Sequence, residues 1–139
     1  MEGAMSARAL TGRCYCGQLR YTVSGEIRSL CYCHCESCRR ATGAPYVAWG
    51  TVDRANFDVT HGVLSFVRLH ADVERGFCGA CGSQITYAHT ARAAEIDFTL
   101  GTLDAPEDLR PTRHIWVQDK VPWVQIDDGL PQYLTVTTA

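Results

Sequence analysis

Eight cysteines in 139 residues constrain this chain more than any other feature, and they fall into three clusters. Cys14 and Cys16 form the first, Cys78 and Cys81 form the last, and the stretch SLCYCHCESCRR at residues 29–40 holds the middle one. The middle cluster consists of Cys31, Cys33, Cys35 and Cys38. Such clustering is typical either of a small disulfide-linked secreted domain or of a metal-binding protein.

The N-terminal sequence favours metal binding over disulfides. MEGAMSARALTG lacks the apolar segment of a secretory signal. No run approaches the roughly 20 apolar residues that a membrane span requires. We therefore expect a cytoplasmic protein that does not associate with membranes. In a reducing compartment, clustered cysteines are more often metal ligands or catalytic groups than disulfides.

The outer two cysteine pairs have the spacing of partners in one metal site. Residues two apart on an extended segment point to the same face, so Cys14 and Cys16 present two sulfurs together. Cys78 and Cys81 have the turn spacing of a zinc knuckle. A glycine follows each pair and allows a tight turn under the sulfurs. Four thiolates complete the tetrahedral shell of a structural zinc. The alternative is an iron–sulfur cluster, but the sequence contains none of the cysteine runs of ferredoxins.

Geometry argues against a second closed site in the middle cluster. Ligand sulfurs on one zinc lie under roughly 4 Å apart, because each Zn–S bond is about 2.3 Å. In an extended chain Cys31 and Cys35 would lie roughly 13 Å apart. The compact set is Cys33, Cys35 and Cys38, with residues 36–37 folding the chain back. Three ligands leave a position for water or substrate, so we expect these cysteines to form a catalytic and labile zinc site.

Cys31 is then a spare thiol. The simplest interpretation is a small buried hydrophobic residue. The alternatives are a fourth zinc ligand in a resting state, or a thiol that forms a disulfide with one of the three cysteines when the metal leaves.

The remaining sequence predicts one mainly β domain over residues 1–139, with residues 1–10 as a flexible leader. The strand signature is alternation of apolar and polar residues, rich in β-branched and aromatic side chains and bounded by turn residues. Two short helical turns are expected, ESCRRATG ended by Gly43, and DAPEDL with Asp104 as N-cap. The expected strand segments are residues 18–23, 45–52, 63–69, 84–88, 95–101, 113–118 and 122–126.

Charge and motifs exclude several function classes. The net charge is -2 and the basic residues are scattered, so we expect no nucleic-acid partner. The chain contains neither a phosphate-binding glycine loop nor the elbow of serine hydrolases. Arg39 and Arg40 follow the middle cluster and are candidates for binding the carboxylates of a substrate or for offsetting the net negative charge of a three-thiolate zinc. The alternative is a solvated pair of charges. His34, between two ligands, is expected to point away from the metal.

The remaining histidines of interest and the tryptophans are assigned from the sequence pattern. His89 and His114 have no partner at metal-ligand spacing and are expected to be structural. The three tryptophans are expected to fill the core, or one of them to wall a substrate pocket. They are Trp49, Trp116 and Trp123.

Five segments together resemble the glutathione-dependent formaldehyde-activating enzyme family, which includes centromere protein V and S-(hydroxymethyl)glutathione synthase relatives. They occur in the family's order and cover most of the chain. They are GRCYCGQLRY (12–21), CHCESCRRATGAP (33–45), RGFCGACGSQITY (75–87), LGTLDAPEDLRPTRHIW (100–116) and PWVQIDDGLPQY (122–133).

The resemblance implies zinc-stapled β-sheets similar to those of B-type methionine sulfoxide reductases. It implies a structural zinc on Cys14, Cys16, Cys78 and Cys81, and a dissociable zinc on the three middle cysteines. It also implies a carbon–sulfur lyase or synthase that joins glutathione to a small aldehyde such as formaldehyde. The alternative is a zinc-stabilised β interaction module without turnover. A methionine sulfoxide reductase would need a reactive free cysteine, and only Cys31 is available.

Overall fold

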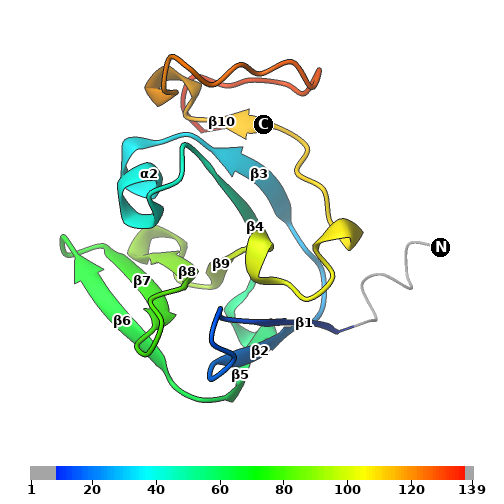
Figure 1. The fold of residues 1–139 in the computed structure, drawn as a ribbon, viewed down its shortest axis with the longest axis vertical. Helices are drawn as coiled ribbons and strands as arrows, with labels where there is room; N and C mark the ends of the chain where they lie inside the picture. Colours follow the sequence, from blue (N-terminus) through cyan, green and yellow to red (C-terminus); the bar gives the residue numbers. More distant parts are fainter. Residues whose placement is uncertain (1–8, 137–139) are drawn as a thin grey trace.

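The computed structural model describes residues 9–136, which fold into two β-sheets and, within that range, a single α-helix (Figure 1). The mainly β prediction is confirmed. The strands are β1 (Leu10–Arg13), β2 (Arg20–Val23), β3 (Ser29–Cys33), β4 (Val47–Asp53), β5 (Phe57–His61), β6 (Leu64–Leu69), β7 (Val73–Cys78), β8 (Gln84–His89), β9 (Glu95–Thr99) and β10 (His114–Ile115). The helix is α2 (Glu36–Thr42), and the short 3-10 helices are η1 (Arg54–Asn56), η2 (Thr90–Arg92), η3 (Leu100–Thr102), η4 (Pro106–Asp108) and η5 (Val117–Asp119).

The smaller sheet has the strand order β1-β2-β5, and the larger has the order β10-β3-β4-β9-β8-β7-β6. All pairings between these strands are antiparallel except that of β10 with β3. Because two strands close in sequence can pair through a short turn, most of the larger sheet is a meander. The parallel β10 instead brings the C-terminal part of the chain back to β3, as the orange and blue arrows at the upper edge of Figure 1 show.

The main apolar core contains residues from both sheets. Tyr21 on β2 is 1% exposed and stacks on Phe57 of β5 with ring centroids 4.9 Å apart. Phe98 of β9 is fully buried in the same cluster. Gly12 on β1 lies against the Tyr21 ring so closely that a Cβ there would be 2.3 Å from ring atoms. The two outer cysteine pairs therefore sit on loops that a shared core holds together.

Most of the predicted elements are confirmed, with four corrections. Of the predicted strand at residues 113–118, only His114–Ile115 form β10, and the 3-10 helix η5 follows at Val117–Asp119. Residues 122–126 are not a strand, and Trp123 is 72% exposed instead of filling the core. The N-cap of η4 is Ala105 and not Asp104, whose carboxylate accepts a 2.6 Å hydrogen bond from Thr11 Oγ1. Of the predicted leader, residues 1–8 lie outside the described range, and Leu10 pairs with Val23 as the first residue of β1.

The turn from β3 into α2 positions the middle cysteine cluster. Cys35 is the N-cap of α2, and its sulfur accepts a hydrogen bond from the Cys38 amide at 3.3 Å. The helix ends as predicted at Gly43, which has a φ of 74°. The chain thus reverses direction between Cys35 and Cys38 and brings their sulfurs to one place.

A C-terminal strap, defined here as residues 113–135, runs along the edge of the larger sheet beside β3. It contains β10 and η5, and it folds back on itself so that the His114 amide donates to Pro131 O at 2.9 Å and the Tyr133 amide donates to His114 O at 3.0 Å. Figure 1 shows the orange and red strap above β3 and α2. None of the helices in residues 9–136 is long and apolar enough to cross a membrane.

Candidate metal centres and the adjoining cavity

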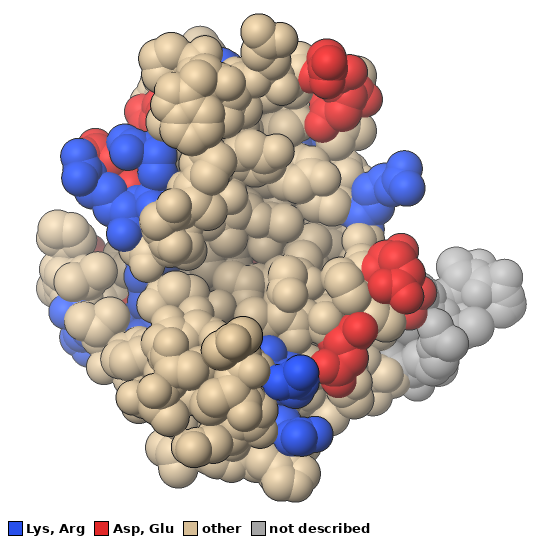
Figure 2. All heavy atoms as spheres, viewed as in Figure 1, with Lys and Arg blue, Asp and Glu red and all other residues tan. Residues whose placement is uncertain are grey.

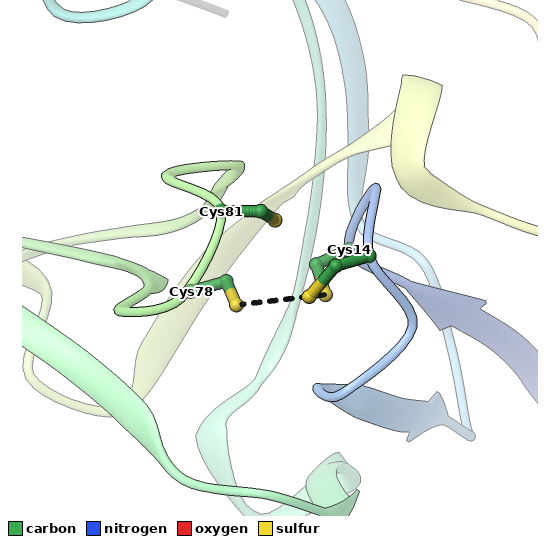
Figure 3. A group of neighbouring side chains, drawn as sticks. Cys14, Cys78 and Cys81 are labelled. Carbon is green, nitrogen blue, oxygen red and sulfur yellow. Dashed lines mark hydrogen bonds between the residues drawn. The ribbon is translucent and has the colours of Figure 1, made fainter.

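The four outer cysteines meet in one place although 62 residues separate Cys16 from Cys78. The Sγ atoms of Cys14 and Cys16 are 3.6 Å apart, and those of Cys16 and Cys78 are 3.8 Å apart. All four ligand atoms lie within 4.8 Å of one another. Figure 3 shows Cys78 at the end of β7 and Cys81 on the loop that follows, facing Cys14 on the loop after β1. These separations match the sulfur spacing of a tetrahedral four-thiolate site.

The two loops that carry these pairs have related backbone turns. The Gly17 amide donates to Cys14 O, and the Gly82 amide donates to Cys78 O. Both glycines have a positive φ, 83° and 84°, which side chains other than glycine rarely adopt. The glycines after each pair therefore make the turns that the sequence predicted.

Polar contacts surround the four sulfurs. The Leu19 amide donates to Cys14 Sγ at 3.3 Å. The Ser83 hydroxyl lies 3.2 Å from Cys81 Sγ and lowers the pKa of that thiol to about 5. The Tyr15 amide on the other loop donates to the same hydroxyl at 2.9 Å. Such contacts fix the sulfurs in place and favour the thiolate form that a metal requires.

The middle cluster contains a second, smaller group of sulfurs. Cys33, Cys35 and Cys38 have ligand atoms within 4.8 Å of one another, as the geometric argument predicted. Cys33 and Cys38 are buried, at 5% exposure each. Hydrogen bonds from Cys33 and Cys35 lower the pKa of Cys38, while the bond with Cys35 raises that of Cys33. Without a metal, the group therefore favours a single thiolate, at Cys38. A bound cation is needed to stabilise all three cysteines as thiolates.

A buried arginine supplies positive charge to this group. Arg75 on β7 is 2% exposed, and its Nη2 donates to Cys38 Sγ at 3.8 Å. Its guanidinium lies over the Tyr87 ring, 4.9 Å from the centroid. A three-thiolate zinc has a net charge of -1, which a guanidinium offsets. Arg75 was not among the site residues predicted from the sequence, because it lies 37 positions from Cys38 along the chain.

Cys31 stays outside both groups of sulfurs. It lies on β3 opposite Trp49 of β4 and is 6% exposed. Burial raises the pKa of its thiol to about 12, so the thiol is protonated at neutral pH. All eight cysteines are free of disulfides. These observations support the interpretation of Cys31 as a small buried hydrophobic residue.

The three-cysteine group opens onto a cavity of about 840 Å³. Trp49, Tyr87 and Trp116 supply its aromatic walls, and Cys31 also borders it. Trp116 adopts the left-handed conformation, with a φ of 58°, which is uncommon for a bulky residue and is typical of functional sites. The lining also includes other charged residues of both signs. They are Arg28, Arg92, Arg113, Glu36, Glu95, Asp97 and Asp119.

The two arginines predicted to bind an anion lie outside the cavity that the three cysteines line. Neither Arg39 nor Arg40 is among the residues that line the cavity. Arg40 forms an exposed 2.8 Å ion pair with Glu36, one turn earlier on α2. The Nε atom of Arg39 is buried and has no hydrogen-bond partner among residues 9–136. On the face shown in Figure 2, charged side chains lie mainly toward the margins, and the centre is formed by uncharged residues.

None of the histidines near the metal loop belongs to either group of possible ligand atoms in residues 9–136. His34 is fully buried and lies between Cys33 and Cys35, but it is not in either group of ligand atoms and does not line the cavity. His114 is also buried. His89 caps η2 by accepting from the Ala91 amide, and it borders the cavity.

Comparisons with known proteins place this arrangement in a family. A protein of Rhodobacter sphaeroides solved by crystallography has the same fold, with a TM-score of 0.61 and 20% identity, over 89% of this chain and 99% of that chain. An uncharacterized lyase of Schizosaccharomyces pombe, C29B12.13, is 28% identical over 79 residues, so the match spans 57% of each chain. The family model described as glutathione-dependent formaldehyde-activating enzyme matches residues 9–119. The chain therefore belongs to the glutathione-dependent formaldehyde-activating enzyme family.

Proposed function

We propose that this protein is a zinc-dependent carbon–sulfur lyase or synthase that acts on a glutathione-type thiol and a small aldehyde such as formaldehyde. The family supports the glutathione and formaldehyde chemistry, and the relative from Schizosaccharomyces pombe is itself named a lyase. In this proposal Cys14, Cys16, Cys78 and Cys81 hold a structural zinc, and Cys33, Cys35 and Cys38 hold a catalytic zinc.

One observation carries the proposal. The three-cysteine group borders a cavity of about 840 Å³, whereas none of the outer four cysteines is among that cavity's lining residues. A volume of this size is typical of small-molecule sites and suits a ligand as large as a tripeptide. The site with fewer ligands is therefore the one beside space for a substrate.

The residues around the site suit the addition of a thiol to an aldehyde. A zinc ion there would supply Lewis acidity and favour the thiolate form of a bound thiol. Arg75 offsets negative charge beside Cys38, and Trp49, Tyr87 and Trp116 give the cavity an aromatic wall. In the reaction a C–S bond forms, the carbonyl π bond breaks, and the thiol proton ends on the former carbonyl oxygen. No oxidant or reductant is needed, and the reverse cleavage uses the same groups.

A carboxylate-binding role for Arg39 and Arg40 remains a prediction. The pair follows Cys38 directly on α2, and the ion pair with Glu36 would have to be exchanged for a substrate carboxylate. Isothermal calorimetry with glutathione tests this role. Unchanged binding in both Arg39→Ala and Arg40→Ala would contradict it. The cytoplasmic location likewise remains a prediction.

The decisive experiment measures the formation of S-(hydroxymethyl)glutathione by the zinc-loaded protein. We expect the rate to exceed the uncatalysed rate and to fall to that rate in Cys38→Ser. Cys31→Ser is the matched control, because Cys31 borders the same cavity but is not in the three-cysteine group. A zinc-loaded protein that neither accelerates the reaction nor binds a low-molecular-weight thiol would refute the proposal and leave the non-catalytic zinc-stabilised module.

A further inference from the structure

From the geometry behind the metal loop we infer that His34, His114 and Asp128 are positioning residues for the three-cysteine site. Their hydrogen-bonded chain anchors the loop to the C-terminal strap and so sets the affinity for the metal. The inference rests on the proposed zinc site at Cys33, Cys35 and Cys38.

The three side chains form a continuous chain of hydrogen bonds. His34 Nε2 lies 2.8 Å from His114 Nδ1, and His114 Nε2 lies 2.8 Å from Asp128 Oδ2. His34 and His114 are 0% and 2% exposed, while the Asp128 side chain is 40% exposed. This series of hydrogen bonds thus runs from the surface of the strap to the back of the metal loop.

The direction of the hydrogen bonds follows from Asp128. Its ionised carboxylate only accepts, so His114 donates to it from Nε2. With His114 neutral, its Nδ1 accepts the Nε2 proton of His34. Each ring is then held in one tautomer and one orientation. Within residues 9–136, His34 Nδ1 has no hydrogen-bond partner, so the chain ends there.

His34 is well placed to control the neighbouring sulfurs. Successive side chains on an extended segment alternate between faces, so the ring points away from the cavity that Cys33 and Cys35 border. The ring stacks on Tyr46 with centroids 4.6 Å apart. A shift of this ring would move the backbone on both sides of it, and each side carries a proposed ligand.

Main-chain hydrogen bonds join the same two segments. The Tyr32 amide donates to Arg113 O at 2.9 Å, and the His34 amide donates to Ile115 O at 3.0 Å. These bonds set the register of β10 against β3, and the Glu36 amide also donates to Asp119 Oδ2 of the strap at 3.2 Å. The hydrogen bond between the His34 and His114 side chains adds a contact on the loop itself. This loop is the part of the structure that must hold the three sulfurs together.

A purely structural role would have different consequences. If the histidines only filled space, an apolar side chain of similar size would serve, and loss of the chain would lower the stability of the whole fold. If the chain positions the loop, the three-cysteine site weakens selectively, and a side chain that restores the hydrogen bond rescues it.

The test compares zinc affinities of the two sites in Asp128→Ala, measured by competition with a chromogenic chelator. We expect the dissociation constant of the three-cysteine site to rise about 10-fold to 100-fold, the range for groups that orient metal ligands. The four-cysteine site should be unchanged. Asp128→Asn keeps an acceptor oxygen and should recover part of the affinity. Asp127→Ala is the matched control on the adjacent exposed carboxylate.

A second pair of variants and two spectra make the result independent of activity. His34→Gln can still donate to His114 and should bind zinc more tightly than His34→Leu. Cobalt(II) at the three-cysteine site should show altered visible bands in His34→Leu and near-normal bands in His34→Gln. In the metal-free protein, slowly exchanging ring N–H signals of His34 and His114 should be seen by NMR and lost in Asp128→Ala.

Equal affinities in Asp128→Ala and the wild type, or equal weakening of both metal sites, would overturn the inference. Failure of the proposed function is distinguishable, because the wild type itself would then bind only one zinc or show no thiol chemistry. If the wild type binds two zinc ions and the variants do not differ from it, only the positioning role fails.

Discussion

Nη2 of Arg75 lies 3.8 Å from the sulfur of Cys38, in a region where the arginine is only 2% exposed. A buried guanidinium without an anionic partner is strongly unfavourable. Within residues 9–136 Arg75 forms no ion pair with a carboxylate, and its guanidinium contacts the Tyr87 ring and the cysteine sulfur. The three-cysteine group therefore supplies negative charge to the arginine as much as the arginine supplies positive charge to the group.

Replacing Arg75 should weaken metal binding at one site only. In Arg75→Met the thiolates lose the nearby cation, so we expect zinc affinity at the three-cysteine site to fall about 10-fold to 100-fold. Arg75→Lys keeps the charge but loses the planar contact with Tyr87 and should give an intermediate value. Competition with a chelator measures the zinc affinity of the three-cysteine site in both variants.

The control for Arg75 is Arg68→Met on the neighbouring strand β6. Arg68 pairs with Glu74 at 2.7 Å, and its side chain is 59% exposed, so its loss should change neither zinc site. Equal zinc affinities in Arg75→Met and Arg68→Met would contradict the charge-balancing role.

Substitution of Cys31 should leave both metals in place. Its sulfur lies outside both ligand groups and its pKa is raised to about 12, so Cys31→Ala removes neither a ligand nor a thiolate. We expect two zinc ions per chain by elemental analysis and a loss of about 1 kcal/mol in stability from the small cavity. A stoichiometry of one zinc would show instead that Cys31 is a ligand.

The two sites should differ in their contribution to folding. Cys14 and Cys78 belong to the main core and join loops from different sheets, so Cys78→Ser should unfold the protein or lower its melting temperature strongly. Cys38→Ser should release one zinc while the fold persists. Circular dichroism and zinc content, measured together during titration with a chelator, check this. Simultaneous loss of both metals and of the fold would contradict it.

Tyr21 predicts a specific loss of stability at alkaline pH. Burial raises its pKa to about 12, against about 10 in an unfolded chain. Above pH 10 the unfolded state releases the phenol proton while the folded state keeps it, so stability is complete below pH 10 and falls as pH rises. The loss reaches about 2 to 3 kcal/mol near pH 12.

Tyr21→Phe isolates this effect. It removes the 2.7 Å hydrogen bond to Thr102 Oγ1 at a cost of about 1 kcal/mol, and it should also remove this part of the pH dependence. Urea unfolding at about pH 9 and about pH 11 measures the slope. An identical slope in both proteins would show that Tyr21 does not cause it.

The metal groups could be predicted from the sequence because sulfur coordination is short-ranged and demanding. The argument that separated Cys31 from Cys33, Cys35 and Cys38 needed only bond lengths and the rise of a strand, and the observed grouping agrees with it. Gly17 and Gly82 were predictable for a similar reason, since a turn under two sulfurs requires a positive φ.

Contacts between distant parts of the chain could not be predicted in this way. Arg75 approaches Cys38 across 37 positions of sequence, and His34 meets His114 across 80. Nothing in the local pattern of either segment encodes the partner. The PWVQI segment failed as a strand prediction because alternation alone does not provide a neighbouring strand to pair with.

The parallel pairing of β10 with β3 has a consequence for synthesis of the protein on the ribosome. The loop with Cys33, Cys35 and Cys38 is made before β4 to β9, whereas the strap that holds its rear side is made after them. The four-cysteine site needs only residues up to Cys81 and is complete sooner. We expect nascent chains in which Cys81 has left the ribosome, but the strap has not, to retain zinc at the first site and not yet at the second. Translation would then impose an order on metal loading, in which scaffold assembly precedes the formation of a competent reaction centre.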